Sequence, residues 1–190
     1  FQALLRARPV AGDPNLWQEF EALVDPLRYP ASGLTPAQTR EVRTMKARVE
    51  SERLPRGADP RTHLKLGTGG LTDVEWTVQL IQLRHAHEFE ALRTPGTLTG
   101  LQAAYEAGLV SADDAASLAA AYGMATRLRN ANQLWRGRHA DALPSDVRDA
   151  DGIGRIVGRE PGTGSALVED YLRQARRARV VVESLFYESR

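Results

Sequence analysis

Apolar side chains recur at intervals of three and four residues along most of the chain, which is the spacing of one face of an α-helix. The last segment shows the pattern most clearly, with apolar positions at Leu167, Tyr171, Ala175, Ala178, Val182 and Leu185. No segment alternates apolar and polar residues over the length of a strand with comparable clarity. The pattern predicts an all-α fold, an irregular helical bundle.

Capping residues indicate where several helices begin. Asp13-Pro14 opens a helix through Val24, Thr35-Pro36-Ala37-Gln38 opens one to about Arg53, and Ser111 to Asp114 opens a long one to about His139. Glycines and prolines indicate where helices end. The helix over Thr97–Ala107 is predicted to stop at Gly108, and the helix over Asp151–Val157 at Gly158. After the first helix the chain is interrupted by Pro26, Pro30 and Gly33. Residues 54–70 are predicted to form a long loop.

A helix from about residue 71 to 92 is predicted to be the buried, central helix of the bundle. Two apolar stripes run along it, one through Leu71, Val74, Val78, Ile81 and His85 and the other through Trp76, Leu80, Leu83 and His87. A helix that is apolar on opposite faces is packed on both. Glu75 should then form a buried pair, for example with an arginine of a neighbouring helix, because a buried unpaired charge is very costly. Asp73 could accept a hydrogen bond from Thr77 or from a backbone N–H of the first turn.

Three glycines and a lysine precede this helix in "HLKLGTGGLTDVEW", which begins at His63. Glycines before a helix leave backbone N–H groups open to an anion, and Lys65 would add a positive charge, so the stretch could bind phosphate. The P-loop and dinucleotide signatures both fail, since Leu71 follows Gly70 and Thr72 stands where the latter needs glycine. Asp73 would also repel a bound anion. The residues favour a structural turn over a ligand-binding loop.

Composition narrows the class of protein. The 190 residues are 42% apolar, contain no cysteine, and carry 25 Lys and Arg against 24 Asp and Glu. The near balance of charge argues against a chain built to coat nucleic acid, and the apolar runs are too short to span a membrane. We expect a cytoplasmic protein without a secretory leader, without disulfides, and without a metal site, since the four histidines lack ligand spacing.

The segment "KLGTGGLTDVEWTVQLIQLRHAHE" resembles the signature K-x-G-x-G-G-[IL]-x-D-[IV]-E-[FW]-x-x-Q of the bacterial glutamine synthetase adenylyltransferases. Two further stretches, "QALLRARPVAGDP" from Gln2 and "EVRTMKARVESERLP" from Glu41, also resemble that family. Thr72 departs from it, because arginine is frequent at that position. Enzymes of the family have two similar halves, each with a nucleotidyltransferase core and a helical domain.

The resemblance implies that this chain is the helical domain that follows such a core, and the ending "VVVESLFYESR" suits the C-terminal half, which adenylylates. The chain lacks the catalytic signature of the family, a Gly-Ser-Asp-x-Asp type sequence that holds magnesium. The implied reaction of the full-length enzyme is transfer of AMP from ATP, with Mg²⁺, to a tyrosine of glutamine synthetase, and this fragment alone should be inactive. Expected partners are glutamine synthetase, the PII signalling protein and the upstream core. Residues 1–60 would link the core to a bundle of residues 61–190, or residues 1–190 would form one domain.

The resemblance makes five residues candidates for lying near the nucleotide or the substrate: Lys65, Gly69, Gly70, Asp73 and Glu75. Each also has a simpler interpretation. Lys65 would be a solvated lysine, the glycines a turn, Asp73 a cap and Glu75 an ion-pair partner. No catalytic or metal-binding residue is assigned. Arg173, Arg176, Arg177 and Arg179 should form a solvated face of the last helix. If the resemblance is set aside, the chain reads as a stand-alone helical interaction module.

Overall fold

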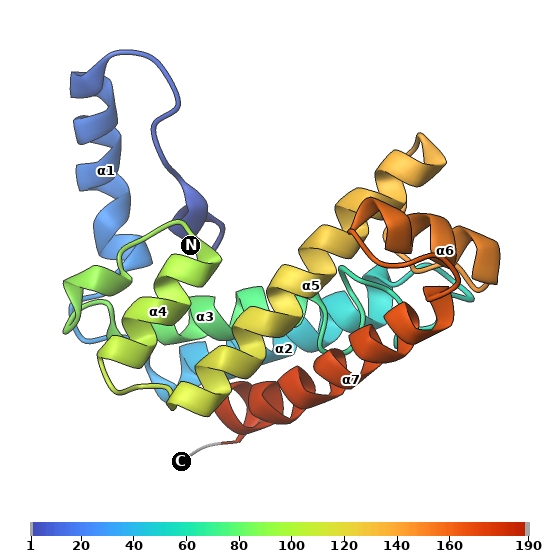
Figure 1. Ribbon diagram of the computed structural model, residues 1–190. Coiled ribbons are helices and arrows are strands. Elements are labelled where there is room, and N and C mark those ends of the chain that lie inside the picture. Colours follow the sequence, from blue (N-terminus) through green and yellow to red (C-terminus); the bar gives the residue numbers. More distant parts are fainter. Residues whose placement is uncertain (1, 189–190) are drawn as a thin grey trace. The chain divides into compact units, whose positions relative to one another are not determined.

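The computed structural model describes residues 2–188, so Phe1, Ser189 and Arg190 lie outside the described part (Figure 1). In chain order the elements are η1 (Gln2–Arg6), α1 (Pro14–Arg28), α2 (Pro36–Arg53), α3 (Leu71–His85), η2 (Glu90–Leu92), α4 (Thr97–Glu106), α5 (Ala112–Arg136), α6 (Val147–Ile156), α7 (Gly164–Val182) and the π-helical η3 (Glu183–Tyr187). Over residues 2–188 there is no strand, only an isolated antiparallel bridge between His63 and Ala142. The all-α prediction is confirmed.

The chain forms two compact units, and neither is continuous in sequence. Unit 1 contains residues 1–45 and 75–115, and unit 2 contains residues 46–74 and 116–190. Helices α2, α3 and α5 each begin in one unit and end in the other. The boundary near residue 60 stays a prediction, as does the alternative of one domain over residues 1–190.

Three predicted helix starts, those of α1, α2 and α5, are confirmed by capping hydrogen bonds. The Asp13 carboxylate accepts the N–H of Asn15 at 2.8 Å. At the start of α2, Thr35 Oγ1 accepts the N–H of Gln38 at 3.2 Å while Gln38 Oε1 accepts the N–H of Thr35 at 2.9 Å, which is a reciprocal capping box. Ser111 Oγ likewise accepts the N–H of Asp114 at 3.1 Å. These starts depend on side chains within three residues of the helix, so sequence alone predicts them.

Helix α3 ends at His85, so the prediction that it reaches residue 92 was wrong. Tertiary hydrogen bonds replace the helical ones there. The Gln82 side chain donates to the carbonyls of Leu92 and Thr94 at 2.8 and 2.7 Å, and Arg93 Nε donates to the carbonyl of Ala86 at 2.9 Å. A basic side chain that binds a carbonyl of the last turn is a known helix stop. The chain therefore turns back over the end of α3, within unit 1.

Three other boundaries differ from the prediction. Helix α1 continues through the exposed Pro26 to Arg28, whose guanidinium binds the Asp25 carboxylate one turn back at 2.5 Å. Helix α5 ends at Arg136 rather than His139, because Gly137 adopts φ +61°, the left-handed conformation that closes helices. Helix α6 begins at Val147 rather than Asp151, since Asp146 caps it by accepting two backbone N–H groups.

No residue of α3 is exposed, which confirms the prediction of a helix buried on both apolar faces. In unit 2 the core combines the start of α3 with α5, α6 and α7, the last two of which lie side by side (Figure 1). Its buried members are Leu64, Leu71, Ala125, Leu128, Ala131, Leu143, Ile153, Leu167, Tyr171 and Ala175. Within the described part of the chain, every helix is too short or too polar to cross a membrane.

Candidate functional site

The glycine loop, residues 63–70, uses its own backbone donors. Leu66 N–H donates to His63 Nδ1 at 3.0 Å, and Gly69 N–H donates to the Asp73 carboxylate at 2.7 Å. Backbone carbonyls of residues 60–67 accept the remaining N–H groups of this run at 2.8–3.0 Å. These N–H groups belong to Gly67, Thr68, Gly70, Leu71 and Thr72. Each N–H from residue 66 to 72 is therefore engaged within unit 2. The loop has no unengaged N–H group in this run to offer a phosphate.

Gly69 and Gly70 are both required by the loop, for different reasons. Gly69 has φ +71°, and a β-carbon there would lie 2.0 Å from the carbonyl oxygen of Ala175 in α7. Gly70 has no positive φ, but its β-carbon would lie 2.7 Å from the carbonyl oxygen of Leu64. Of the two, only Gly69 adopts the left-handed conformation. The loop backbone touches α7 so closely that only glycine fits.

The anion that the glycine loop binds is the carboxylate of Asp73, which belongs to the helix that follows the loop. This side chain is 2% exposed, in the first turn of α3. Its Oδ1 lies 2.5 Å from Lys46 Nζ, and its Oδ2 lies 3.2 Å from the Arg179 guanidinium and accepts the N–H of Gly69. Asp73 thus receives two cations and a backbone donor at a helix N-terminus, where a negative charge is also favoured by the helix dipole.

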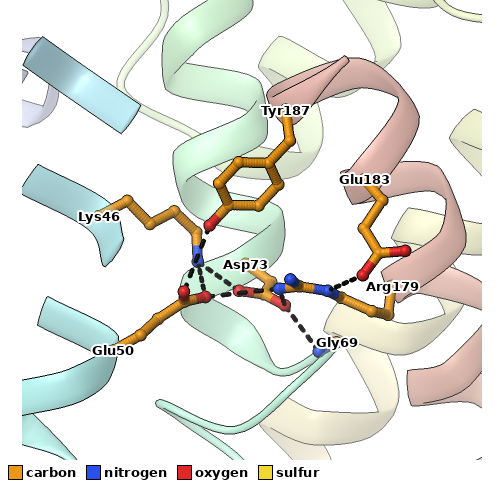
Figure 2. A network of polar contacts seen from close by, with 7 residues as sticks. All are labelled: Lys46, Glu50, Gly69, Asp73, Arg179, Glu183 and Tyr187. Carbon is orange, nitrogen blue, oxygen red and sulfur yellow. Dashed lines mark hydrogen bonds and ion pairs between the residues drawn. The ribbon is translucent and has the colours of Figure 1, made fainter. Parts of the chain in front are cut away.

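Figure 2 shows how the contacts extend beyond Asp73 to form the ion cluster, which consists of Lys46, Glu50, Asp73, Arg179, Glu183 and Tyr187. Glu50 lies one turn after Lys46 on α2 and binds its ammonium at 2.5 Å. The Arg179 guanidinium reaches Glu50 at 3.4 Å and Glu183 at 2.8 Å, and Tyr187 Oη donates to Glu50 at 3.3 Å. The cluster joins α2, the start of α3, α7 and η3, all within unit 2.

Lys46 has no exposed side-chain surface, and the ring of Phe186 lies 5.9 Å from its ammonium. Burial alone would lower the pKa of Lys46, but the charge of Asp73 and hydrogen bonds to Asp73 and Glu50 outweigh burial and raise it above the ordinary value. For the Tyr187 hydroxyl, burial has the opposite effect and raises the pKa, because the charged form of tyrosine is the deprotonated one. At neutral pH the lysine is therefore a cation and the tyrosine a neutral donor. The cluster is arranged to hold charges in place rather than to exchange protons.

The five candidate residues do not form one site. The N–H of Gly69 contacts Asp73, and Gly70 lies between these two residues in the sequence. The side chain of Lys65 is exposed on the glycine loop. Glu75 belongs to unit 1, where it pairs with Arg6 at 3.1 Å. An arginine partner for Glu75 is confirmed, but the expected burial was wrong, because the two side chains are 26% and 43% exposed. The buried acid of this helix is Asp73.

Lys46 and Arg179 were not among the predicted site residues. Arg179 was expected on a solvated face, which is correct for Arg173, Arg176 and Arg177 but wrong for Arg179, only 24% exposed. One signal was available, since Arg179 follows Ala175 by four residues and so continues the buried row of α7. Lys46 follows the buried Val42 by the same interval. Helical spacing could have found both.

No group of three or more acidic or histidine side chains suited to a metal ion occurs in residues 2–188. The carboxylates of the ion cluster face lysine, arginine and backbone N–H groups rather than each other. These residues do not fit Mg²⁺, which the resemblance assigns to the upstream core, and no metal-dependent step follows from them.

Comparisons with known proteins give relatives along nearly the whole chain. The sequence model of the family described as GlnD PII-uridylyltransferase matches residues 43–188. A protein of Streptomyces coelicolor named bifunctional glutamine synthetase adenylyltransferase/adenylyl-removing enzyme is 56% identical over 97% of the chain. Proteins of the same name from Leifsonia xyli and Mycobacterium avium are 54% and 52% identical over 98% and 97% of the chain. The chain spans only 18% of the length of each of these three relatives.

Proposed function

Since this chain belongs to the GlnD PII-uridylyltransferase family, we propose that it is the helical, non-catalytic part of an enzyme that transfers AMP to glutamine synthetase and removes it. The observation that carries the proposal is the 56% identity to a relative of that name over 97% of the chain. The absence of a Gly-Ser-Asp-x-Asp type sequence supports assigning the chemistry to another part of the enzyme.

The proposal places this chain directly after a nucleotidyltransferase core, in the C-terminal half of the full-length enzyme. ATP and Mg²⁺ would bind to that core, and the enzyme would act in the cytoplasm, which the absence of cysteine suits. Glutamine synthetase would be the protein substrate, and PII would be a regulatory partner. The small share of each relative that the chain covers, 18% in the relative from Streptomyces coelicolor, leaves room for such a core.

Within this enzyme unit 2 would act as a structural support. The ion cluster fixes the glycine loop against α7 through Asp73, and it does so with contacts inside unit 2 alone. Of the five candidate residues, Lys65 has an exposed side chain on that loop. We therefore expect any contact of the loop with nucleotide or substrate to be made by Lys65 rather than by backbone N–H groups.

The test compares the 190-residue chain with the full-length enzyme from the same gene. Each is incubated with Mg²⁺, unmodified glutamine synthetase and ATP labelled on its α-phosphate. The full-length enzyme should label glutamine synthetase, whereas the chain alone should be helical by circular dichroism and transfer nothing. AMP transfer by the chain alone would contradict the proposal. A parallel reaction with labelled UTP and PII covers the activity that the family description names, and UMP transfer in its place would redirect the proposal to PII.

A further inference from the structure

The C-terminal end of helix α1 packs against other residues of unit 1. Val24, Arg28 and Tyr29 are buried there. The Arg28 guanidinium binds the carboxylates of Asp25 and Glu21 at 2.5 and 3.0 Å and donates to the carbonyl oxygen of Ala7 at 3.3 Å. The last turns of α1 are thus tied to the segment that precedes the helix.

Another face of α1 carries a row of exposed apolar side chains. Leu16, Phe20, Leu23 and Leu27 are 66%, 37%, 72% and 55% exposed, and their spacing of four, three and four residues places them in one stripe. Figure 1 shows α1 running back along the extended segment before it. Between them lies a groove of about 780 Å³, lined in part by Val10, which is 86% exposed, Leu16, Trp17 and Phe20. We call the stripe and the groove together the α1 apolar surface.

The surroundings of the α1 apolar surface are acidic. At 100° per residue, Glu19 lies beside the stripe, whereas Glu21 lies roughly 130° from it and pairs with Arg28. Asp13 caps the helix beside the groove. Unit 1 as a whole contains seven arginines, no lysine and eleven Asp or Glu. A partner suited to this surface offers an apolar face with basic groups at its rim. A second copy of the same surface would bring acidic rims together, which argues against self-association.

We propose that the α1 apolar surface is covered in the full-length enzyme by the nucleotidyltransferase core of the same polypeptide. The inference rests on the proposed function, which supplies that core. A chain that spans 18% of its relative leaves most of the polypeptide available to cover it. A contiguous exposed apolar stripe with a groove beside it is a candidate interaction site. A partner in the same chain binds without the loss of translational freedom, so a modest patch suffices.

Hydrogen exchange read by mass spectrometry tests the proposal on the 190-residue chain and on the full-length enzyme. Amides of residues 15–23 should exchange at least about tenfold more slowly in the full-length enzyme. Leu23→Glu in the full-length enzyme should abolish that protection. The matched control is Leu134→Glu, because Leu134 lies on α5 with an exposed fraction of 73%, against 72% for Leu23. It should leave exchange in α1 unchanged.

Equal exchange in the two proteins overturns the proposal, as does a concentration-dependent dimer of the 190-residue chain that protects α1. Protection that arises only when glutamine synthetase is added also overturns it, since a separate protein is then the occupant. The exchange readout does not depend on activity. If the full-length enzyme modifies glutamine synthetase while α1 stays unprotected, the docking proposal fails alone. If α1 is protected but no AMP is transferred, the proposed function fails alone.

Discussion

The ammonium of Lys46 lies 2.5 Å from the carboxylate of Asp73, although 27 residues separate them and each side chain is at most 2% exposed. The contact joins α2 to the first turn of α3 within unit 2. Arg179 and the N–H of Gly69 complete the shell around Asp73. Burial of both charges makes this pair costly to break from one side, because the remaining charge is left buried without full compensation.

Lys46→Met should lower the free energy of unfolding by about 3 kcal/mol, because removing one partner of a buried pair leaves the other charge without full compensation. Arg48→Met is the matched control. Arg48 pairs with Glu52 one turn later on the same helix, but the two side chains are 67% and 56% exposed, so its loss should cost about 0.5 kcal/mol or less. Urea denaturation of both variants checks the difference, and equal costs would mean that the buried pair is not structural.

Glu75→Gln should cost less than about 1 kcal/mol, because its pair with Arg6 is partly exposed to water. Asp73→Asn, which removes the same charge two residues earlier, should cost several times more. The two melting temperatures, measured on the 190-residue chain, rank the acids directly. A larger loss for Glu75→Gln would contradict this ranking and restore Glu75 as the principal buried acid.

Gly69→Ala should destabilise the chain well beyond the usual cost of a left-handed alanine, which is about 1 kcal/mol. Gly57→Ala isolates that usual cost, since Gly57 has φ +78° but nothing within 4 Å of its β-carbon. The excess at Gly69 measures the close approach to α7. Denaturation midpoints give both values, and similar shifts for the two variants would show that α7 moves away freely.

Lys65→Ala should leave the melting temperature unchanged, because the side chain is exposed. In the full-length enzyme, a contact between Lys65 and the transferred phosphate would show as a lower turnover of AMP transfer, since a cation near developing phosphate charge stabilises the transition state. Lys65→Arg keeps the charge and should retain most of the activity. Steady-state kinetics separate the cases, and wild-type constants for Lys65→Ala would mean that the loop serves only as a turn.

The stability of the chain should fall as the pH drops below about 6.5, in part through His63. Burial lowers the pKa of His63 below its ordinary 6.5, despite the nearby charge of Asp141. The unfolded chain then takes up the proton more readily, so the contribution of His63 is complete above the unfolded pKa and is lost below it. Protonation would also break the bond that Nδ1 accepts from Leu66.

His63→Asn keeps an acceptor near Leu66 but does not titrate, so it should reduce the loss of stability between about pH 7 and pH 5. Burial also lowers the pKa of His85, which should account for part of the remaining loss. Melting temperatures across that range provide the measurement. An unchanged pH dependence in His63→Asn would rule out His63 as a contributor.

The sequence by itself determined the all-α class, the starts of α1, α2 and α5, and the buried character of α3. Caps such as Thr35 with Gln38 act within one turn, and an apolar stripe repeats every three or four residues, so both are visible locally. The turn at the glycines before α3 was also visible, although the close approach of Gly69 to Ala175 was not. These features depend on neighbours in the chain, which is why a single sequence predicts them.

Only the tertiary structure decided which acid is buried and what the loop binds. Asp73 and Glu75 lie two residues apart on one helix, yet Asp73 meets Lys46 and Arg179, whereas Glu75 meets the half-exposed Arg6. Arg179 is 106 residues from Asp73 along the chain. Helical spacing fixes the face on which a charge lies, but not the partner that arrives there from a distant segment. The end of α3 at His85 has the same origin, because Arg93 binds the carbonyl of Ala86 only after the chain has turned back.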